Sequence, residues 1–440
     1  MKQETIFKSF MKYVPLNILG MIGLSCYILA DTFFVSKGLG TNGLASLNLA
    51  ISIYSFINGS GLMIGIGAAT KYSILKAQNK HMDADNVFTT SIKLGTILGA
   101  LFMLIGIFFS SPLSMLLGAN TDTFSMANTY LKTILFFAPF FILNNVLLSF
   151  VRNDGNPKLS MSAMLLGSFS NIILDYIFIF PLQWGMFGAA FATGLAPIIS
   201  IGLLSLHFIN MKNNFHFKKC KIMPRLIINI CELGISSLIT EISSGIVLII
   251  FNIVILRLKG NIGIAAYGIV ANLSLVAMSI FTGISQGIQP LISNYYGVKN
   301  YHDLKKTFYY SIVLSLVISV SLYLITFISS DWLISLFNNE KNLTLAILAK
   351  QGLHIYFIGF FFAGINIITA SFFSSVENPK KGLIISILRG FVAIVPVVLI
   401  LSKLLEIYGV WCAFPCSETI TFIVAVYYLK NHIRISKKSY

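Results

Sequence analysis

The segment RNDGNPK (Arg152–Lys158) recurs in weaker form as SSVENPK (Ser374–Lys380), and the shared Asn-Pro-Lys triplet is shifted by 222 residues, from Pro157 to Pro379. Two further pairs of segments match at nearly the same shift. GLASLNLA (43–50) falls over GIAAYGIV (263–270) at a shift of 220, and GMFGAA (185–190) falls over GVWCAF (409–414) at a shift of 224. Matches at a nearly constant shift indicate that the second half of the chain duplicates the first.

Apolar runs surround these matching segments. Of the 440 residues, 56% are hydrophobic and only 10% are charged, and the mean hydropathy is +0.84. A soluble chain carries about a quarter charged residues, whereas a helix that crosses a bilayer needs about 20 mostly apolar residues. We therefore predict membrane-crossing helices near 14–36, 44–75, 88–110, 124–150, 158–182, 186–210, 224–257, 262–296, 304–329, 344–375, 380–402 and 406–430.

The longest polar break runs from Asn210 to Arg225 and divides the crossings into two sets of six. We predict an all-α polytopic membrane protein with twelve transmembrane helices in two lobes, residues 1–215 and 216–440. An even number of crossings per half gives the lobes the same orientation, so a pseudo-twofold axis runs along the membrane normal. The expected substrate path is the cavity between the lobes.

The basic residues indicate how the chain is oriented. The formal net charge is +16, and most of the lysines and arginines fall in polar breaks that share one side if crossings alternate. The positive-inside rule then predicts that both termini are cytoplasmic in a multi-pass protein of the cell membrane. This distribution excludes nucleic acid as the partner of the basic residues. There is also no phosphate-binding GxxxxGK[ST] loop and no HExxH helix, so we expect neither an enzyme nor a cofactor.

Acidic residues within crossings are costly in lipid, so each is a functional hypothesis. The four that qualify are Asp31, Asp175, Glu241 and Glu418. The other ionisable residues of the crossings lie nearer to predicted helix ends, where a side chain can reach the membrane surface. Such snorkelling is the expectation for Lys93, His207, His354 and Arg389.

Three of the polar residues of the first half share one depth. Asp31, Asp175 and Thr193 should each lie roughly 10 Å below the outer surface, given the rise of a helix. Asn171 precedes Asp175 by one helical turn and projects from the same face. Carboxylate, amide and hydroxyl oxygens suit a hard cation such as Na⁺, and two carboxylates in a dry site can share a proton instead. The alternative is that both acids only hydrogen-bond neighbouring helices.

The second half offers two further acids. Glu241 lies near the middle of the seventh crossing, and Glu418 lies in the middle of the twelfth. Under the repeat shift of 224 residues, Glu418 falls beside Thr193. A role in cation binding and a purely structural role are both open for these two glutamates.

The motifs together resemble those of the multidrug and toxic compound extrusion (MATE) family. The resemblance covers nearly the whole chain and rests on LADTFFVSKGLGTNGLASL (29–47), RNDGNPKLSM (152–161), NIILDYIFIF (171–180), WGMFGAAFATG (184–194) and VENPKKG (376–382). It implies a 6 + 6 helix fold with a V-shaped central cavity and drug efflux driven by inward flow of Na⁺ or H⁺. It also implies a cation site at Asp31, Asn171, Asp175 and Thr193. Other members use acids of the seventh and tenth crossings, but here the tenth has no acid before Glu377, which puts a second-lobe site in doubt.

These inferences predict a transporter of amphipathic or cationic small molecules that acts as a monomer by cation antiport. The rival interpretation is a flippase of lipid-linked oligosaccharides or peptidoglycan precursors, whose families resemble this one in fold. Such flippases usually have about fourteen crossings and a strongly cationic cavity. The twelve predicted crossings and the small number of deep lysines and arginines favour the exporter.

Overall fold

Helices make up all of the regular secondary structure in the described residues of this computed structural model, which are 5–219, 223–338 and 342–438. The first half contains α1 (Ile6–Ala77), α2 (His81–Leu116), α3 (Phe124–Phe136), α4 (Ala138–Asn153), α5 (Pro157–Ile179), α6 (Gly185–Leu204) and α7 (Leu206–Ile209). The second half contains α8 (Pro224–Gly297), α9 (Tyr301–Ile328), α10 (Ser330–Ser335), α11 (Leu343–Tyr356), the 3₁₀ turn η1 (Phe357–Gly359), α12 (Phe360–Ser375), α13 (Pro379–Ile387), the π-helical turn η2 (Leu388–Val392) and α14 (Ile394–Lys438).

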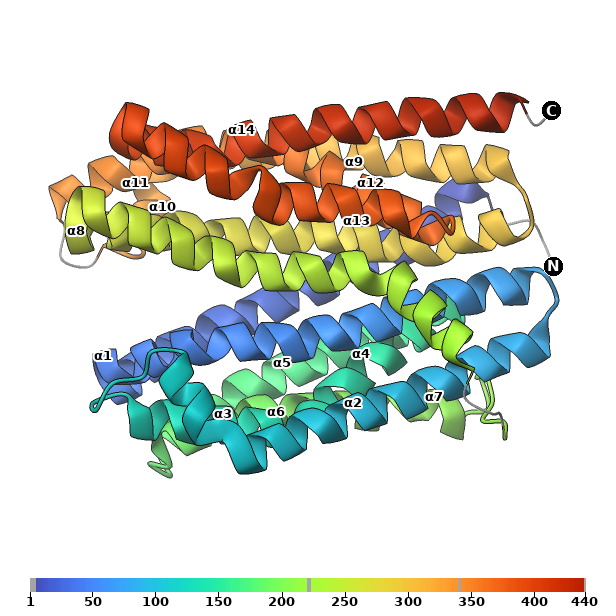
Figure 1. Cartoon of the computed structure of the whole chain (residues 1–440), viewed down its shortest axis with the longest axis horizontal. Coiled ribbons are helices and arrows are strands. Elements are labelled where there is room, and N and C mark those ends of the chain that lie inside the picture. Colours follow the sequence, from blue (N-terminus) through green and yellow to red (C-terminus); the bar gives the residue numbers. More distant parts are fainter. Residues whose placement is uncertain (1–4, 220–222, 339–341, 439–440) are drawn as a thin grey trace.

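Three of these helices are too long to cross a membrane once. α1 has 72 residues, which would span about 108 Å if it were straight, against a bilayer core of about 30 Å. It reverses at Gly40, whose φ of 69° and ψ of −161° suit a residue without a Cβ. α8 reverses in the same way at Gly260, and α14 reverses at Glu406. Each of these helices therefore forms a hairpin of two crossings (Figure 1).

Counting crossings with these reversals gives twelve in the part of the chain that the structure describes. α2, α5, α6 and α9 each cross once, and α3 with α4 forms one crossing bent by 48°. α11, η1 and α12 together form another crossing, while α13 with α14 forms two. The prediction of six crossings in each half is confirmed.

The duplication is visible in the backbone at the breaks between crossings. Four residues with positive φ in the first lobe have a counterpart with positive φ in the second lobe at the expected shift. The pairs are Gly40 with Gly260 and Asn79 with Lys299 at a shift of 220, Gly155 with Glu377 at 222, and Gln183 with Glu406 at 223. The two lobes therefore repeat one path in one orientation, as the matching segments predict.

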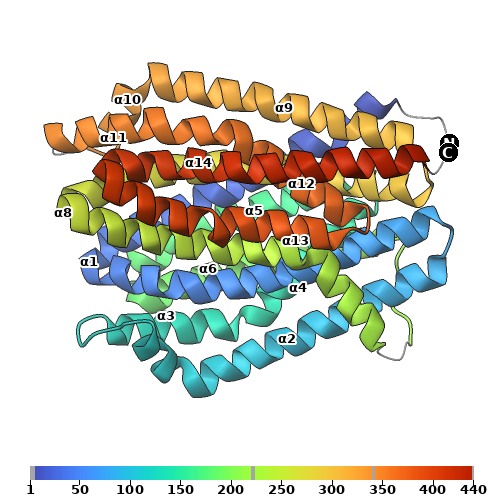
Figure 2. The same cartoon turned by 45° about the horizontal axis from the view of Figure 1, so that its top comes forward.

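In the view of Figure 1, α2–α7 lie below and α9–α14 above, while the first turns of α1 and α8 each reach toward the opposite lobe. Figure 2 shows the same helices after a turn of 45°. Each lobe has a buried core of apolar side chains, and the start of the other lobe contributes to it, through Phe10 and Val14 of α1 in the second-lobe core and Ile230 of α8 in the first-lobe core. α1 begins and α14 finishes at one end of the molecule, which we call the terminal end. The reversals at Gly40 and Gly260 lie at the opposite end, the far end.

The lobes are closed against each other toward the terminal end. A Cβ on Gly67 would overlap the Ile230 carbonyl oxygen, and a Cβ on Gly234 would overlap that of Met63. The repeat produces a second close approach of the same kind. There, a Cβ on Gly287 would lie 2.8 Å from the Cα of Val14. The hairpins α1 and α8 thus cross in two places where only glycine fits.

Candidate functional site

Asp31 and Asp175 meet inside the first lobe. Asp31 projects from α1 and is 7% exposed, and Asp175 projects from α5 and is fully buried. Their carboxyl groups lie close enough to interact with each other. A hydrogen bond between two carboxyl groups would require a proton on one of them, because ionised carboxylates only accept. The depth argument thus placed both residues at one level, and the structure brings them into contact.

Asn171 and Thr193 complete this cluster. The Asn171 amide is oriented so that both of its polar atoms have hydrogen-bond partners. Its nitrogen donates to Asp175 Oδ2 at 3.1 Å, and its oxygen accepts from the Thr193 backbone N–H at 3.2 Å. The Thr193 hydroxyl donates to the Ala189 carbonyl one turn earlier in α6. Both residues are buried, so the four predicted residues from α1, α5 and α6 form one group.

The carboxyl groups of this cluster have unused acceptors. Asp31 Oδ1 and Asp175 Oδ1 are buried and have no hydrogen-bond partner. No Lys, Arg or His among the described residues forms an ion pair with either acid, although ion pairs do form elsewhere in the molecule. Buried carboxylates without a counter-charge are unstable, so the pair requires a proton or a bound cation. The two free oxygens could serve as ligands for a cation such as Na⁺.

Sequence reasoning missed three tyrosines that surround the pair. The Tyr130 hydroxyl on α3 hydrogen-bonds Thr193. The hydroxyls of Tyr27 and Tyr54 hydrogen-bond each other at 2.8 Å, and both rings lie near enough to Asp31 to interact with its charge. A tyrosine within an apolar run carries no signal that separates it from a packing residue, so the sequence could not single out these three.

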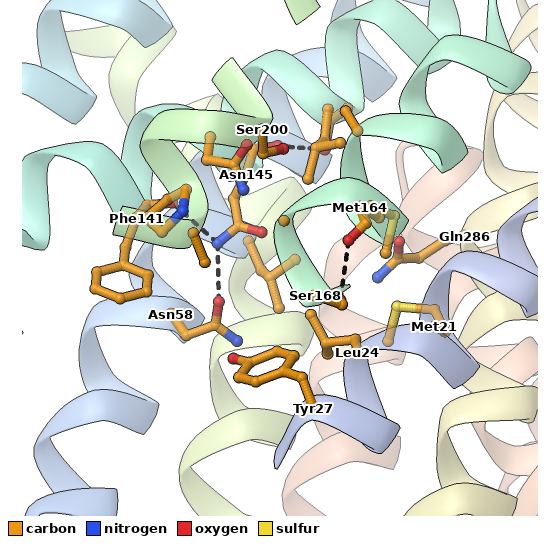
Figure 3. Close-up of a pocket in the computed structure, with 18 of the residues that line it drawn as sticks. Met21, Leu24, Tyr27, Asn58, Phe141, Asn145, Met164, Ser168, Ser200 and Gln286 are labelled. Atoms are coloured by element: carbon orange, nitrogen blue, oxygen red, sulfur yellow. Dashed lines mark hydrogen bonds between the residues drawn. The ribbon is translucent and has the colours of Figure 1, made fainter. Parts of the chain in front are cut away.

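A cavity in the first lobe adjoins this cluster, since Thr193, Tyr27 and Tyr54 are among its lining residues (Figure 3). Tyr27, Asn58, Asn145 and Ser168 are among its polar lining, and Met21, Leu24 and Phe141 are among its apolar lining. Asn145 donates to Asn58 at 2.9 Å across the cavity wall. The second lobe contributes Glu241 and Gln286. The first-lobe cavity is therefore amphipathic and opens toward the other lobe.

Glu241 lies at the junction of the lobes. It projects from α8, hydrogen-bonds Asn58 of α1, and lines both the first-lobe cavity and a cavity between the lobes. Among the described residues it has no carboxylate partner of the kind that Asp31 and Asp175 form.

Glu418 is held in an ion pair. Its Oε1 accepts from Arg389 Nε at 2.9 Å, and its Oε2 accepts from Asn366 Nδ2 at 2.7 Å. Arg389 lies in the π-helical turn η2, a feature that often marks functional positions. The expectation that Arg389 snorkels to the membrane surface is wrong, because only 8% of its side chain is exposed and its charge is neutralised by Glu418. Glu418 therefore already has a cationic partner, which Asp31 and Asp175 lack among the described residues.

The snorkelling expectation is also wrong for His207, which is 1% exposed. Its Nε2 lies 3.0 Å from Asp154 Oδ2 at the terminal end. Asp154 also accepts from Tyr72 and Lys76 of α1 and from the Asn214 backbone N–H. This network holds the segment after α7 against the first lobe.

A second cavity lies between the lobes. It is lined by Leu62 and Arg152 of the first lobe, by Ser236, Thr240 and Glu241 of α8, and by Ser371, Ser374 and Arg389 beyond α8, among others. Near its terminal-end wall, Gln289 Nε2 donates to Thr70 Oγ1 at 2.9 Å, and Lys71 forms an ion pair with Glu377 at 2.5 Å. The loop-proximal Glu377 thus ties the lobes together.

No cluster of three or more His, Cys, Asp or Glu side chains that could hold a metal ion occurs in residues 5–219, 223–338 and 342–438. A cation at Asp31 and Asp175 would therefore rely on the amide and hydroxyl oxygens around the two carboxyl groups. Such a ligand set fits a weakly held, exchangeable ion better than a structural metal.

Known proteins match this architecture over its whole length. The multidrug export protein MepA of Staphylococcus saprophyticus is 26% identical over 99% of this chain and 97% of its own, and the MepA of Staphylococcus haemolyticus is 27% identical over 100% and 97%. A solved structure described as the outward-facing conformation of a multidrug resistance MATE family transporter of the MOP superfamily has the same fold. Its TM-score is 0.92 at 23% identity, covering 99% of this chain and 98% of that one. The MatE family model matches residues 17–177 and 236–399, one segment in each lobe. The chain therefore belongs to the MatE family of transporters.

Proposed function

We propose that this protein exports amphipathic or cationic small molecules from the cell by exchange with an inward-moving cation, Na⁺ or H⁺, which binds at Asp31 and Asp175. The observation that carries the proposal is the buried pair of carboxyl groups, which has two unpartnered oxygens and no ion pair with a basic side chain of the described residues. The multidrug export for which the staphylococcal relatives are named supports the direction and the kind of cargo. Asn171 and Thr193 orient the pair.

The proposed orientation places the terminal end in the cytoplasm of a cell-membrane protein. The positive-inside distribution supports it. With this orientation, the lobes are closed on the cytoplasmic side, which is the outward-facing form of an exporter. The lobes, residues 1–215 and 216–440, then move against each other in a monomer, and the cavity between them is exposed alternately to each side.

The chemistry of the pair explains how a cation could drive this movement. Unless a cation or proton is bound, two ionised carboxylates in contact repel each other in a low-dielectric site. Cation binding therefore favours the arrangement in which α1 and α5 are drawn together, and cation release favours their separation. A ligand can shift a conformational equilibrium only by its difference in affinity for the two states, and this contact supplies such a difference.

The test is transport in proteoliposomes with Na⁺ and pH gradients imposed separately and ethidium as the cargo. We expect one of the gradients to drive ethidium movement in the wild type, and Asp31→Asn and Asp175→Asn each to abolish it. Asp122→Asn is the matched control, because Asp122 is an exposed residue outside the cavities. Wild-type rates in both folded pair variants would refute the assignment of the cation site.

A further inference from the structure

The cavity between the lobes contains a set of buried hydrogen-bond donors without partners. Arg152 Nε, Ser236 Oγ and Ser374 Oγ all lie in its lining, and none of these atoms has a hydrogen-bond partner. The three residues are 2%, 6% and 4% exposed, respectively. Buried polar groups are normally paired, so three orphan donors around one cavity indicate a ligand that supplies acceptors.

Arg152 is the central member of this set. Its Nη1 donates to Asn17 of α1 at 2.9 Å and to Gln286 of α8 at 2.8 Å, so it connects the two lobes. Both partners are neutral amides, and no acid of the described residues forms an ion pair with it. A guanidinium group is always charged, and a buried charge without a counter-ion costs several kcal/mol. The vacant Nε of Arg152 is therefore a position at which an anion would be stabilised.

The two serines line the same cavity as Arg152. Their hydroxyls come from different helices, α8 and α12, yet each lies 3.1 Å from the place that a Cβ would occupy on Gly382. Both hydroxyls therefore face one small space beside α13. Two hydroxyls and a guanidinium N–H are the donors that bind an oxyanion such as a carboxylate or phosphate group.

The charges around the cavity suit a ligand that carries an anionic group together with a cationic one. Arg389 adds a second guanidinium to the lining, already paired with Glu418. The one acid among the described lining residues is Glu241, which, like Arg152, also lines the first-lobe cavity and interacts with Asn58. An amphiphile with an oxyanion at the Arg152 end and a positive charge toward Glu241 would match both.

We propose that Arg152, Ser236 and Ser374 form an anion subsite that receives the carboxylate, or a chemically similar oxyanion, of a transported amphiphile. This inference rests on the proposed function, in which the cavity between the lobes is the substrate path, and it adds zwitterionic and anionic amphiphiles to the cargo expected there. Arg152 is then a residue that determines specificity and is distinct from the cation pair at Asp31 and Asp175.

Two dyes that differ only at the oxyanion test the proposal. Tetramethylrhodamine carries a free carboxylate, whereas its methyl ester lacks that charge. We measure the binding of both by fluorescence anisotropy to the purified full chain in nanodiscs of phosphatidylcholine. Arg152→Gln should weaken binding of the free acid about tenfold or more, since a hydrogen bond to a charged group is at stake, and leave that of the ester nearly unchanged. Ser236→Ala and Ser374→Ala should also weaken binding of the free acid relative to binding of the ester, by a smaller factor.

Comparing the two dyes distinguishes recognition of the carboxylate by Arg152 from a purely structural role of Arg152. If Arg152 only held the lobes together, its replacement would weaken both dyes alike, and that result would overturn the proposal. Arg257→Gln, which removes an exposed arginine of α8, should change neither dye. Because the serine variants are small changes, they keep the test decisive if Arg152→Gln does not fold.

Three further outcomes distinguish the sources of the oxyanion and separate failure of the anion subsite from failure of the proposed function. If phosphatidylglycerol added to the nanodiscs displaces neither dye but co-purifies with the wild type and not with Arg152→Gln, the site holds a lipid phosphate and the cargo proposal is wrong. If neither dye binds the wild type while ethidium is still transported, the anion subsite fails and the proposed function stands. If no cargo is bound or transported, the proposed function fails with it.

Discussion

Gly234 of α8 lies so close to the Met63 carbonyl oxygen of α1 that no side chain fits between the two helices. Gly67 stands in the same relationship to the Ile230 carbonyl on the other side of this crossing. Such a reciprocal glycine contact allows two backbones to approach closely, as at other membrane helix interfaces. The closed terminal end therefore depends on the absence of two Cβ atoms.

Gly234→Ala should weaken closure at the terminal end. The added methyl group meets backbone, which cannot move aside as a flexible side chain could, and overpacking of this kind costs about 1–3 kcal/mol. The measurement is the rate at which a membrane-impermeant maleimide labels a Ser375→Cys reporter, in a chain whose five native cysteines are replaced. Ser375 is fully buried at this end, so faster labelling reports opening.

Gly268→Ala is the control for this variant, because it lies on the same helix and a Cβ there would meet nothing within 4 Å. It should leave the labelling rate unchanged. Equal rates for the two variants would show that the contact of Gly234 does not determine closure.

Tyr130→Phe should weaken cation binding without abolishing transport. The variant removes the hydroxyl that hydrogen-bonds Thr193 but keeps the buried ring. One lost neutral hydrogen bond is worth about 0.5–1.5 kcal/mol, so the cation concentration at half-maximal efflux should rise about two- to tenfold, with the maximal rate retained. Tyr309→Phe, on an exposed ring, should behave like wild type. An unchanged cation dependence in Tyr130→Phe would remove Tyr130 from the site.

Glu418 and Arg389 should behave as a buried ion pair and not as a coupling site. Glu418→Gln or Arg389→Gln alone leaves one charge buried without its partner, which costs about 3–5 kcal/mol, whereas the double variant should be less destabilised than the sum. Thermal unfolding in detergent measures this coupling. Gradient-driven efflux by folded Glu418→Gln should retain its dependence on Na⁺ or H⁺. If that dependence disappears, Glu418 takes part in coupling.

The fold was predictable because its signals are strong and repeated. Each crossing needs a long apolar run, and the turns between crossings preserve the duplication in the sequence, as at Asn-Pro-Lys. The predicted breaks at 37–43 and 258–261 contain Gly40 and Gly260, but the positive φ of these two glycines was not predicted. The helices on the two sides of each reversal were predicted as separate crossings, which agrees with the hairpins observed.

The candidate cation site was partly predictable. Asp31 and Asp175 stood out because hydrocarbon rejects carboxylates, and helical rise placed them at one depth. Arg389 was assigned wrongly, and Arg152 was not singled out. The reason is the same for both, because distance along a helix does not show whether a long side chain turns toward lipid or toward the protein interior. The contact of Arg389 with Glu418 joins residues 29 positions apart, and no local pattern encodes such a pairing.

Asp154 should make the terminal end of the first lobe sensitive to acid. Burial raises the pKa of this carboxyl group, but the hydrogen bonds from His207, Lys76 and Tyr72 and from the Asn214 backbone outweigh it and hold the pKa below its usual value. A lowered pKa in the folded state stabilises the protein above the pKa of the unfolded chain, and this stabilisation is lost as the pH falls through the folded pKa. Asp154→Asn should therefore lower the thermal midpoint at pH 7, and the difference from wild type should shrink below about pH 4.

Asp122→Asn, at an exposed residue, is the control for the acid experiment, and it should change the midpoint little at either pH. If the difference between wild type and Asp154→Asn is the same at pH 7 and at pH 3.5, the hydrogen bonds to Asp154 do not depend on its charge, and the linkage argument is wrong.

The ion pair between Lys71 and Glu377 should contribute to closure of the terminal end through its charge. The two side chains come from different lobes and are 24% and 29% exposed, so water screens the pair and its worth is about 1 kcal/mol or less. Lys71→Glu places two acids together and should speed maleimide labelling of the Ser375→Cys reporter by about fivefold at most. Glu377→Lys should do the same, and the exchanged pair Lys71→Glu with Glu377→Lys should return the rate toward that of wild type.

The same reversal at Lys350, which pairs with Asp331 on the surface, should have no effect. Raising the salt concentration should reduce the differences between these variants, because ions screen an exposed pair. An exchanged pair that labels as fast as the single variants would mean that Lys71 and Glu377 close the end through packing and not through their charges.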